Sequence, residues 1–242
     1  DAIRHARAAI DLSPQNIIAY ELLGDACFAL DRLPEAVAAF RQALELSPRD
    51  AALHGKLGCV FFQLQDADNA IASLSQAISL QPDLANAYLN RGTIYLNLGQ
   101  SALGLADMES AIRHDPSLID AHLNIAMEMH AQNRRAESAA ALRRVIALDP
   151  QNAFAFNGLA NQLHALNENS EAEACFRQAT TLNPEYTEAF CDWGDHLLSL
   201  DRNAEAAACY QRALALAPDH IRANFHLGIA HYELDQLSQA AG

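Results

Sequence analysis

The sequence predicts an all-α protein built from antiparallel helix pairs stacked along the chain. Three observations predict it: prolines recur at a fixed interval, small and bulky apolar residues recur in register with them, and alanine dominates the apolar residues. The interval is 34 residues, and a fixed period of about 20–50 residues is typical of a stacked repeat array. The prolines on this grid are Pro14, Pro48, Pro82, Pro116, Pro150, Pro184 and Pro218.

Residues 1–16 are predicted to form a single helix that starts at Asp1 and ends at Leu12. Its alanines and Ile10 repeat at helical spacing and make one apolar stripe. Pro14 ends the helix because a residue that precedes proline is disfavoured in the helical region. The same ending recurs before every proline of the grid, so each of these prolines is expected to mark the end of a helix.

From residue 17 onward each unit is predicted to be a pair, called here helix A and helix B. In the first unit helix A spans about residues 17–30 and helix B about residues 34–46. Pro34 suits the first turn of helix B, where a missing N–H costs nothing. The turn positions between the helices are Asp31, Gln65, Gly99, Asn133, Asn167, Asp201 and Asp235. Gly, Asn and Asp tolerate the left-handed conformation that ends a helix, so Gln65 is the exception among them.

Helix B carries three recurring columns. Small residues at the first position are Ala36, Ala70, Gly104, Ser138, Ala172, Ala206 and Ala240, and seven residues later come Ala43, Ala77, Ala111, Val145, Ala179 and Ala213. Bulky residues between them are Phe40, Leu74, Met108, Leu142, Phe176 and Tyr210. Small side chains let two helices approach closely and bulky ones fill the space that they leave, so these columns predict the contact line between helices A and B.

These columns resemble the tetratricopeptide repeat, in which helix A carries an aromatic residue, Leu-Gly and Tyr, and helix B carries Ala, an aromatic residue, Ala and Pro. The first complete unit matches with Tyr20, Leu23, Gly24, Ala36, Phe40, Ala43 and Pro48. The fourth unit is the weakest match, with His122, Ala126, Met129 and Ser138 at signature positions. The resemblance covers all 242 residues and implies a solenoid whose helix pairs form a right-handed superhelix.

The repeat boundaries predict one array over residues 1–242. Residues 1–16 are helix B of a partial repeat, six full repeats follow, and residues 221–242 begin a seventh. The six full repeats are 17–50, 51–84, 85–118, 119–152, 153–186 and 187–220. Solenoid ends are normally covered by a polar helix, and neither end has one here, so a piece of a longer protein is expected.

Composition excludes some partners. The chain has 30 acidic and 16 basic residues and a formal charge of −14, and Lys56 is its only lysine. That charge disfavours nucleic acid and anionic membrane, and it favours a neutral or basic protein or peptide. No apolar run approaches the length of a membrane-spanning helix. The five cysteines are scattered without a CxxC pair, which indicates free thiols in a reducing compartment, and a cytoplasmic location is expected.

No motif of a metalloprotease, a dinucleotide-binding site, a P-loop or a serine hydrolase occurs, so the sequence predicts no catalytic residue, no cofactor and no metal. His130 and His164 share a repeat position in adjacent units, so a metal site between them is one interpretation. Asp195 would be the nearest further ligand. Histidines of a groove without metal are the favoured interpretation. Cys175 and Cys209 also share a position and are read as small buried residues.

The resemblance places helix A on the concave face, and this surface is predicted to bind a peptide. Its central units offer amides, which carry both donor and acceptor and can pair with an extended backbone of any sequence. The predicted groove residues are Asn90, Asn97, Asn124, Met127, His130, Asn157, Asn161, His164, Glu188, Asp192 and Asp195. The last three are hypothesised to select a basic residue.

The favoured function is a non-catalytic scaffold that holds an extended segment of another protein in the groove. Two alternatives stay open. The array resembles, more weakly, the substrate-recruiting arm of O-linked N-acetylglucosamine transferases, which carries a ladder of asparagines along the groove. Asn90 and Asn124 match this ladder, whereas Lys56 and Asp192 stand at ladder positions and do not match it. It also resembles bacterial repeat modules that self-associate end to end. The Lys/Arg–Asn clamp of chaperone-binding repeats is missing its basic partners.

Overall fold

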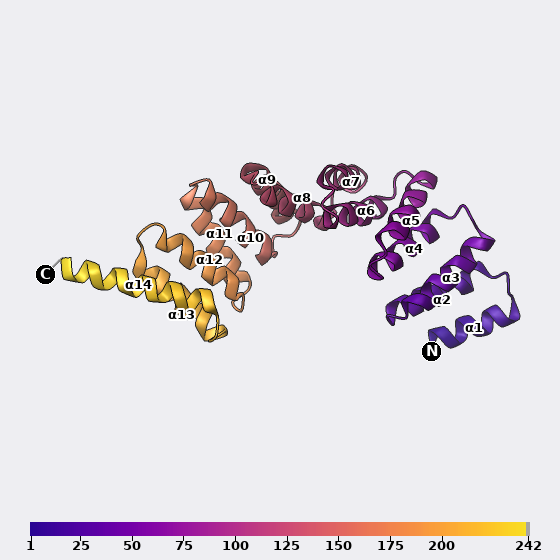
Figure 1. Ribbon diagram of the computed structural model, residues 1–242, viewed down its shortest axis with the longest axis horizontal. Coiled ribbons are helices and arrows are strands. Elements are labelled where there is room, and N and C mark those ends of the chain that lie inside the picture. Colours follow the sequence, from indigo (N-terminus) through magenta and orange to yellow (C-terminus); the bar gives the residue numbers. More distant parts are fainter. Residues whose placement is uncertain (241–242) are drawn as a thin grey trace. The chain divides into compact units, whose positions relative to one another are not determined.

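A computed structural model describes residues 1–240, with side chains described up to Asp235 (Figure 1). Within that part of the chain there are fourteen helices and no strand. The helices are α1 (Ala2–Leu12), α2 (Ile17–Ala29), α3 (Leu33–Leu46), α4 (Ala51–Gln63), α5 (Ala67–Leu80), α6 (Ala85–Asn97), α7 (Ser101–His114), α8 (Ile119–Ala131), α9 (Arg135–Leu148), α10 (Ala153–Ala165), α11 (Asn169–Leu182), α12 (Thr187–Leu198), α13 (Asn203–Leu216) and α14 (Ile221–Ala240). The predicted all-α class and helix-pair architecture are confirmed.

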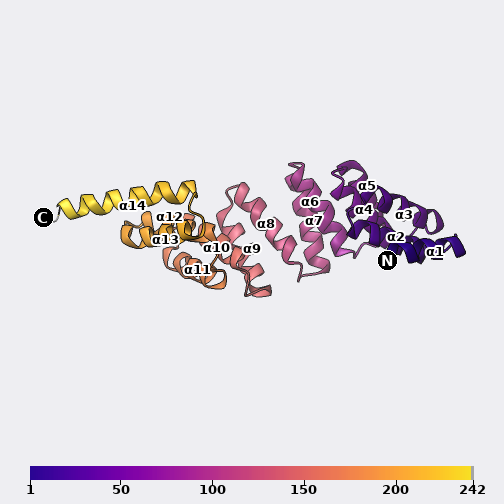
Figure 2. The same cartoon turned by 90° about the horizontal axis from the view of Figure 1, so that it is seen from below.

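The chain divides into two compact units, residues 1–121 and 122–242. In the first unit α2 packs on α3, α4 on α5 and α6 on α7. In the second, α10 packs on α11 and α12 on α13, and both views show the last pair side by side (Figures 1 and 2). Each pair also contacts the pair that follows it within its unit, as expected of a solenoid.

The turn between helices A and B is a tight left-handed stop. In the first repeat Asp31 has φ 57°, and the N–H of Arg32 donates to the carbonyl oxygen of Cys27 at 2.8 Å. This bond closes the last turn of α2 in the manner of a Schellman motif. The residues with positive φ are Asp31, Gln65, Gly99, Asn133, Asn167 and Asp201. Gln65 adopts the conformation although it is not a turn former, because the packing of α4 on α5 outweighs its local preference.

Prolines end the B helices as predicted. Ser47 follows α3 with an extended backbone, φ −135° and ψ 77°, and Pro48 comes directly after it. Pro34 lies in the first turn of α3, where its ring disturbs no hydrogen bond. The predicted and observed bounds of α1, α2 and α3 agree within one residue.

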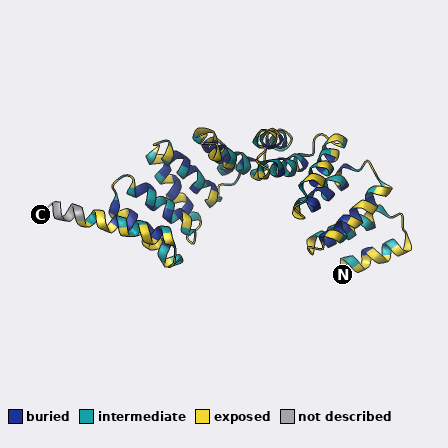
Figure 3. Cartoon of the chain, viewed as in Figure 1, coloured by how far each residue is buried: buried dark blue, intermediate teal, exposed yellow. Residues whose placement is uncertain are grey.

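The predicted columns form the core (Figure 3). Every described member of the two small columns and of the bulky column is buried. Glycines of helix A make room for the bulky column of helix B. A Cβ on Gly24 would lie 2.5 Å from Phe40, and a Cβ on Gly58 would lie 2.6 Å from Leu74. In the fourth repeat the hydroxyl of Ser138 donates to the carbonyl oxygen of Ala126 at 2.8 Å, which satisfies the one polar group of its column.

One predicted turn is wrong. The helix pattern was expected to break at Asp235 before a further helix B, but α14 continues through this residue to Ala240. In the other repeats a helix of fourteen residues packs on helix A and compensates for the left-handed turn. At Asp235 the helix keeps its i→i−4 bonds, because the preference of Asp for a turn is weak and does not by itself end a helix. The side chain of Ala240, predicted to lie in that helix B, and the closing residues Ala241 and Gly242 lie outside the described residues.

None of the helices, among the residues that the structure describes, combines the length and the apolar character that crossing a bilayer requires.

Candidate functional site

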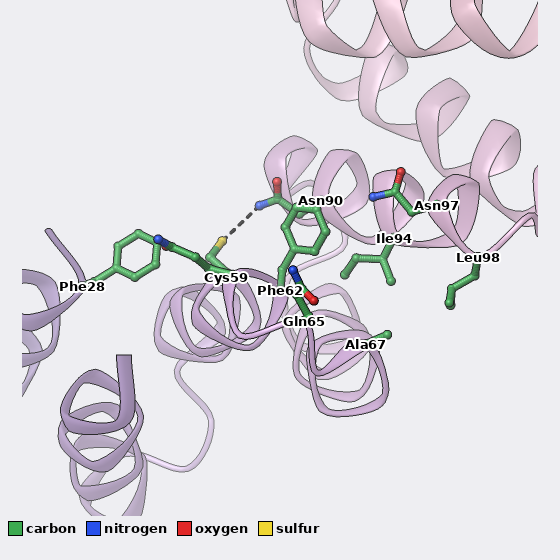
Figure 4. A pocket seen from close by; sticks show the side chains of 10 residues that line it. Phe28, Cys59, Phe62, Gln65, Ala67, Asn90, Ile94, Asn97 and Leu98 are labelled. Carbon is green, nitrogen blue, oxygen red and sulfur yellow. Dashed lines mark hydrogen bonds between the residues drawn. The ribbon is translucent and has the colours of Figure 1, made fainter. Parts of the chain in front are cut away.

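A pocket in the first unit is lined by three successive A helices (Figure 4). Phe28 of α2 lies at one side, Ile94 and Leu98 of α6 lie at the other, and Phe62 of α4 stands between them. The cavity measures about 640 Å³, which is within the range of ligand sites. Its walls are aromatic and aliphatic, so apolar surface is open to solvent at this place.

Two of the predicted groove residues lie in this pocket. Asn90 is half-buried and donates from Nδ2 to the Sγ of Cys59 at 3.1 Å (Figure 4). Asn97 is exposed about two helical turns further along α6. An amide beside an apolar wall can orient a bound peptide group while the wall holds a side chain.

A smaller pocket of about 270 Å³ lies in the second unit between α8 and α10. Four of the predicted residues line it: Met127, His130, Asn157 and Asn161. Met127 is 60% exposed, whereas Asn157 is only 5% exposed. Asn157 therefore forms part of the inner wall of this pocket, and Met127 forms part of its solvent-exposed rim.

Asp192 of α12 is the centre of a polar cluster in the second unit. Its Oδ2 accepts from the Nδ2 atoms of Asn157 at 2.8 Å and Asn161 at 2.9 Å. Its Oδ1 accepts from Arg222 of α14 at 2.7 Å. The carboxylate thus links three successive A helices and already holds a cation, so its role is at least in part to join repeats.

Asp195 is engaged as well. The hydroxyl of Tyr210 donates to its Oδ1 at 2.6 Å, His226 Nδ1 contacts the same oxygen, and Arg222 reaches its Oδ2 at 3.4 Å. Burial raises the pKa of the Tyr210 hydroxyl, and the adjacent Asp195 carboxylate raises it further. The phenol therefore stays protonated and keeps donating to Asp195.

Two further predicted groove residues, Glu188 and Asn124, differ in their surroundings. Glu188 is exposed at the start of α12, and no ion pair or hydrogen bond of its carboxylate is recorded among the described residues. Asn124 is half-buried on α8. Of the three acidic residues assigned to a basic ligand, Glu188 alone offers an open carboxylate.

The two histidines of the metal hypothesis do not face each other. His130 Nδ1 accepts from Arg135 at 2.7 Å and lies near Gln162, whereas His164 Nδ1 lies 3.1 Å from Nδ1 of the fully buried His196. The expected third ligand, Asp195, is held by its own partners. Within residues 1–235 no three His, Cys, Asp or Glu side chains come together as a metal site would require.

The only lysine of the sequence, Lys56, is also held by ion pairs. Lys56 Nζ donates to Glu21 at 2.8 Å and to Asp25 at 2.6 Å, across the step between α2 and α4. Burial opposes its charge, but the two carboxylates outweigh burial and raise the pKa of Lys56. It therefore remains charged and joins repeats.

The apolar part of the first pocket was not among the predicted peptide-binding residues. The repeat pattern places Phe28, Cys59 and Phe62 on inward-facing positions, but the prediction rested mainly on polar side chains of later units. The signal was two bulky aromatic residues that share one repeat position on a face that is otherwise polar. Cys59 is the one thiol of the five that is not buried. Cys175 and Cys209 are buried as expected.

Comparison with known families gives matches along most of the chain. A family model described as "TPR repeat" matches residues 24–65, 58–99 and 194–235, and two described as "Tetratricopeptide repeat" match residues 123–189 and 85–118. The chain belongs to the tetratricopeptide repeat family. No curated protein matches this tetratricopeptide repeat chain by sequence.

Solved structures share the fold. YrrB, described as "a TPR protein with an unusual peptide-binding site", is 20% identical with a TM-score of 0.70 and covers 78% of this chain and 98% of its own. The C-terminal part of a TPR repeat-containing protein from Cytophaga hutchinsonii is 14% identical with a TM-score of 0.77, and each chain is 93% covered. pilF of Pseudomonas aeruginosa is 15% identical with a TM-score of 0.72, covering 93% of this chain and 97% of its own. These likenesses show a shared fold, and the family matches support a protein-interaction scaffold.

Proposed function

We propose that the chain is a non-catalytic interaction scaffold that holds an extended segment of a partner protein along its A helices. The observation that carries the proposal is the lining of the first-unit pocket, where amides stand beside apolar walls on successive A helices. An extended segment has backbone N–H and C=O groups without partners, and side chains of Asn can bond both. The peptide-binding description of YrrB supports the same assignment for this chain.

The ionisable groups of the A helices support a binding role over catalysis. Asp192 and Asp195 are held by Arg222 and by neighbouring polar groups, so both carboxylates have a structural role. Burial raises the pKa of the Cys59 thiol, which disfavours a thiolate nucleophile. These two carboxylates and this thiol are therefore engaged in structure.

The partner is proposed to be basic. The chain carries a formal charge of −14, and the open carboxylate of Glu188 lies on the A-helix face of the second unit. Glu188→Lys is the suitable test of this point, because Asp192 and Asp195 cannot be reversed without breaking the links to Arg222. Binding of a lysine-rich peptide should weaken in this variant, and an unchanged affinity at low salt would contradict the charge assignment.

Selection from a random decapeptide library tests the function. Selected peptides are resynthesised with a fluorescent label, and their affinity is measured by anisotropy against scrambled versions. Asn90→Ala and Asn97→Ala should each weaken binding about tenfold, a loss near that of a well-placed contact. Asn69→Ala on α5 is the matched control, because this exposed asparagine of a B helix should not matter. Selected peptides that bind no better than scrambled ones would overturn the proposal.

The transferase-arm and self-assembly alternatives stay predictions, since no contact within the described residues favours either.

A further inference from the structure

The pocket of the first unit differs from the rest of the A-helix surface in its apolar walls. Phe28 and Phe62 are half-buried, Ile94 is 2% exposed and Leu98 is 48% exposed, and all four face one cavity of about 640 Å³. An aromatic or branched aliphatic side chain would remove this apolar surface from water when it enters. The cavity is more than twice the size of the one in the second unit, about 270 Å³, so it can take a bulky side chain.

The polar edge of this pocket fits a peptide group rather than a free apolar molecule. Asn90 has two amide N–H groups and one oxygen, and the contact with Cys59 Sγ uses one N–H. The other N–H and the oxygen can pair with the carbonyl and N–H of a chain lying along the helices. A second cavity of about 240 Å³ shares Cys59 and Asn90 with the first, so the hollow continues past this contact.

The charges next to the pocket are negative in sum. Asp25 lies one helical turn before Phe28 on α2, Glu21 lies one turn before that, and Asp31 follows α2 and accepts from Gln63 at 3.0 Å. Lys56, one turn before Cys59 on α4, pairs with Glu21 and Asp25. The three carboxylates therefore outnumber this one ammonium group. The carboxylate of Asp25 remains 44% exposed although it pairs with Lys56.

We infer that this pocket, bounded by Phe28, Phe62, Ile94 and Leu98, anchors one bulky apolar side chain of a bound segment that carries Lys or Arg close to the anchor. This rests on the proposed function, because it names the class of segment that the A helices hold. One helical turn, about 5 Å, separates the carboxylate of Asp25 from the pocket wall along α2, and an extended chain advances about 3.3 Å per residue. The basic residue therefore lies about two positions from the anchor.

Two fluorescein-labelled peptide libraries test the inference. Both are degenerate decapeptides with Lys fixed two positions from the centre, and the central residue is Phe in one and Ser in the other. The Phe library should bind at least about tenfold more tightly than the Ser library. Phe62→Ser should remove this preference, whereas Phe62→Leu should keep most of it. Phe154→Ser is the matched control, since Phe154 is an exposed aromatic residue of the second-unit pocket.

Cys59 supplies a second readout at the pocket itself. It is the one cysteine of the five that is not buried, so a maleimide should react there first. Bound Phe library should slow the alkylation of Cys59 several-fold, and the Ser library should not. Thermal melts of each variant show whether it is folded. If Phe62→Ser does not fold, Phe62→Leu still tests the pocket.

The outcomes separate the inference from the function on which it rests. If the two libraries bind equally and alkylation of Cys59 is unchanged, the anchor pocket is wrong while peptide binding stands. If neither library binds and selection also yields no peptide, the proposed function fails with it. Peptides of the Phe library should bind more tightly with Lys than with Gln at the basic position. Asp25→Asn should reduce this difference in affinity, and an unchanged difference would overturn the charge part of the inference.

Discussion

Arg91 and Asp107 form a two-point ion pair between α6 and α7, with Nε to Oδ2 and Nη2 to Oδ1 both at 2.8 Å. Arg91 occupies the position where other repeats carry Leu23 or Leu57, and Asp107 is only 8% exposed. The guanidinium also donates to Ser75 at 2.9 Å. A charge pair has thus replaced an apolar contact within the helix stack.

Removing one partner of this pair should be costly. Arg91→Leu leaves the Asp107 carboxylate buried without its cation, and such changes cost about 3–5 kcal/mol. The double variant Arg91→Leu/Asp107→Ala should recover most of the loss, because no unpaired charge remains. Urea melts of the three proteins measure this. An exposed pair, Arg143 with Glu171, is the control, and Arg143→Ala should cost less than about 1 kcal/mol. A double variant as unstable as Arg91→Leu would contradict the argument.

Two glycines of α4 should respond in opposite directions to alanine. A Cβ on Gly58 would lie 2.6 Å from Leu74, so Gly58→Ala should cost about 1–3 kcal/mol through overpacking. A Cβ on Gly55 would meet nothing within 4 Å, so Gly55→Ala should stabilise α4 by about 0.5–1 kcal/mol through its helix preference. Thermal unfolding of both variants decides it, and shifts of the same sign would refute the packing explanation.

The turn at Gln65 should be improved by glycine. Gln65 has φ 60°, a conformation that costs an L-residue about 1–2 kcal/mol. Gln65→Gly should therefore raise the free energy of unfolding, by about 1 kcal/mol. The same replacement at Gln42, exposed inside α3, should lower it by about as much, because glycine is a poor helix former there. A destabilised Gln65→Gly protein would mean that the side chain makes contacts that matter more than the strain.

His196 should make the fold sensitive to mild acid. Burial lowers the pKa of His196, the neighbouring His164 and Arg202 lower it further, and Glu173 opposes them. Its Nε2 is buried without a partner, and Phe176 covers the ring from α11. Because the folded pKa lies below the unfolded value of about 6.5, the unfolded chain binds the proton more tightly, and stability falls as pH drops through about 6.5.

Melting temperatures at about pH 7.5 and pH 5.5 check the role of His196. His196→Leu should lose less stability than the unchanged chain over this interval. The exposed His5 of α1 supplies the control, and His5→Leu should behave like the unchanged chain. Equal losses in all three proteins would show that other groups govern the acid response.

The repeat architecture could be predicted because its determinants are local. The proline grid ends each helix B through a restriction on one neighbouring residue, and side-chain size alone places Ala36, Phe40 and Ala43 at the contact line. The break predicted at Asp235 is wrong, because residue type alone does not end a helix and α14 continues through this position. Residue type indicates where a turn can form, and tertiary packing decides whether it does form.

The site was less predictable because its contacts join residues far apart in sequence. Asn157 and Asp192 are 35 positions apart, and His164 and His196 are 32 apart, so a repeat position shows which face they share and not which atoms meet. The pairing of Asp192 with Arg222 depends on the side-chain rotamers of two helices. The sequence places these groups on the A helices, and the structure adds that Arg222 pairs with both Asp192 and Asp195.

The packing of each helix pair on its neighbours within a unit also bears on how the protein forms in the cell. The main contacts join helices that are adjacent in the chain, such as α4 with α5 and α12 with α13, and smaller contacts join helices that are next but one. Proteins with such short-range contacts pay little loop entropy and fold quickly. A ribosome that releases this chain repeat by repeat would let each pair dock on the one made before it, so that apolar columns spend little time exposed to other nascent chains.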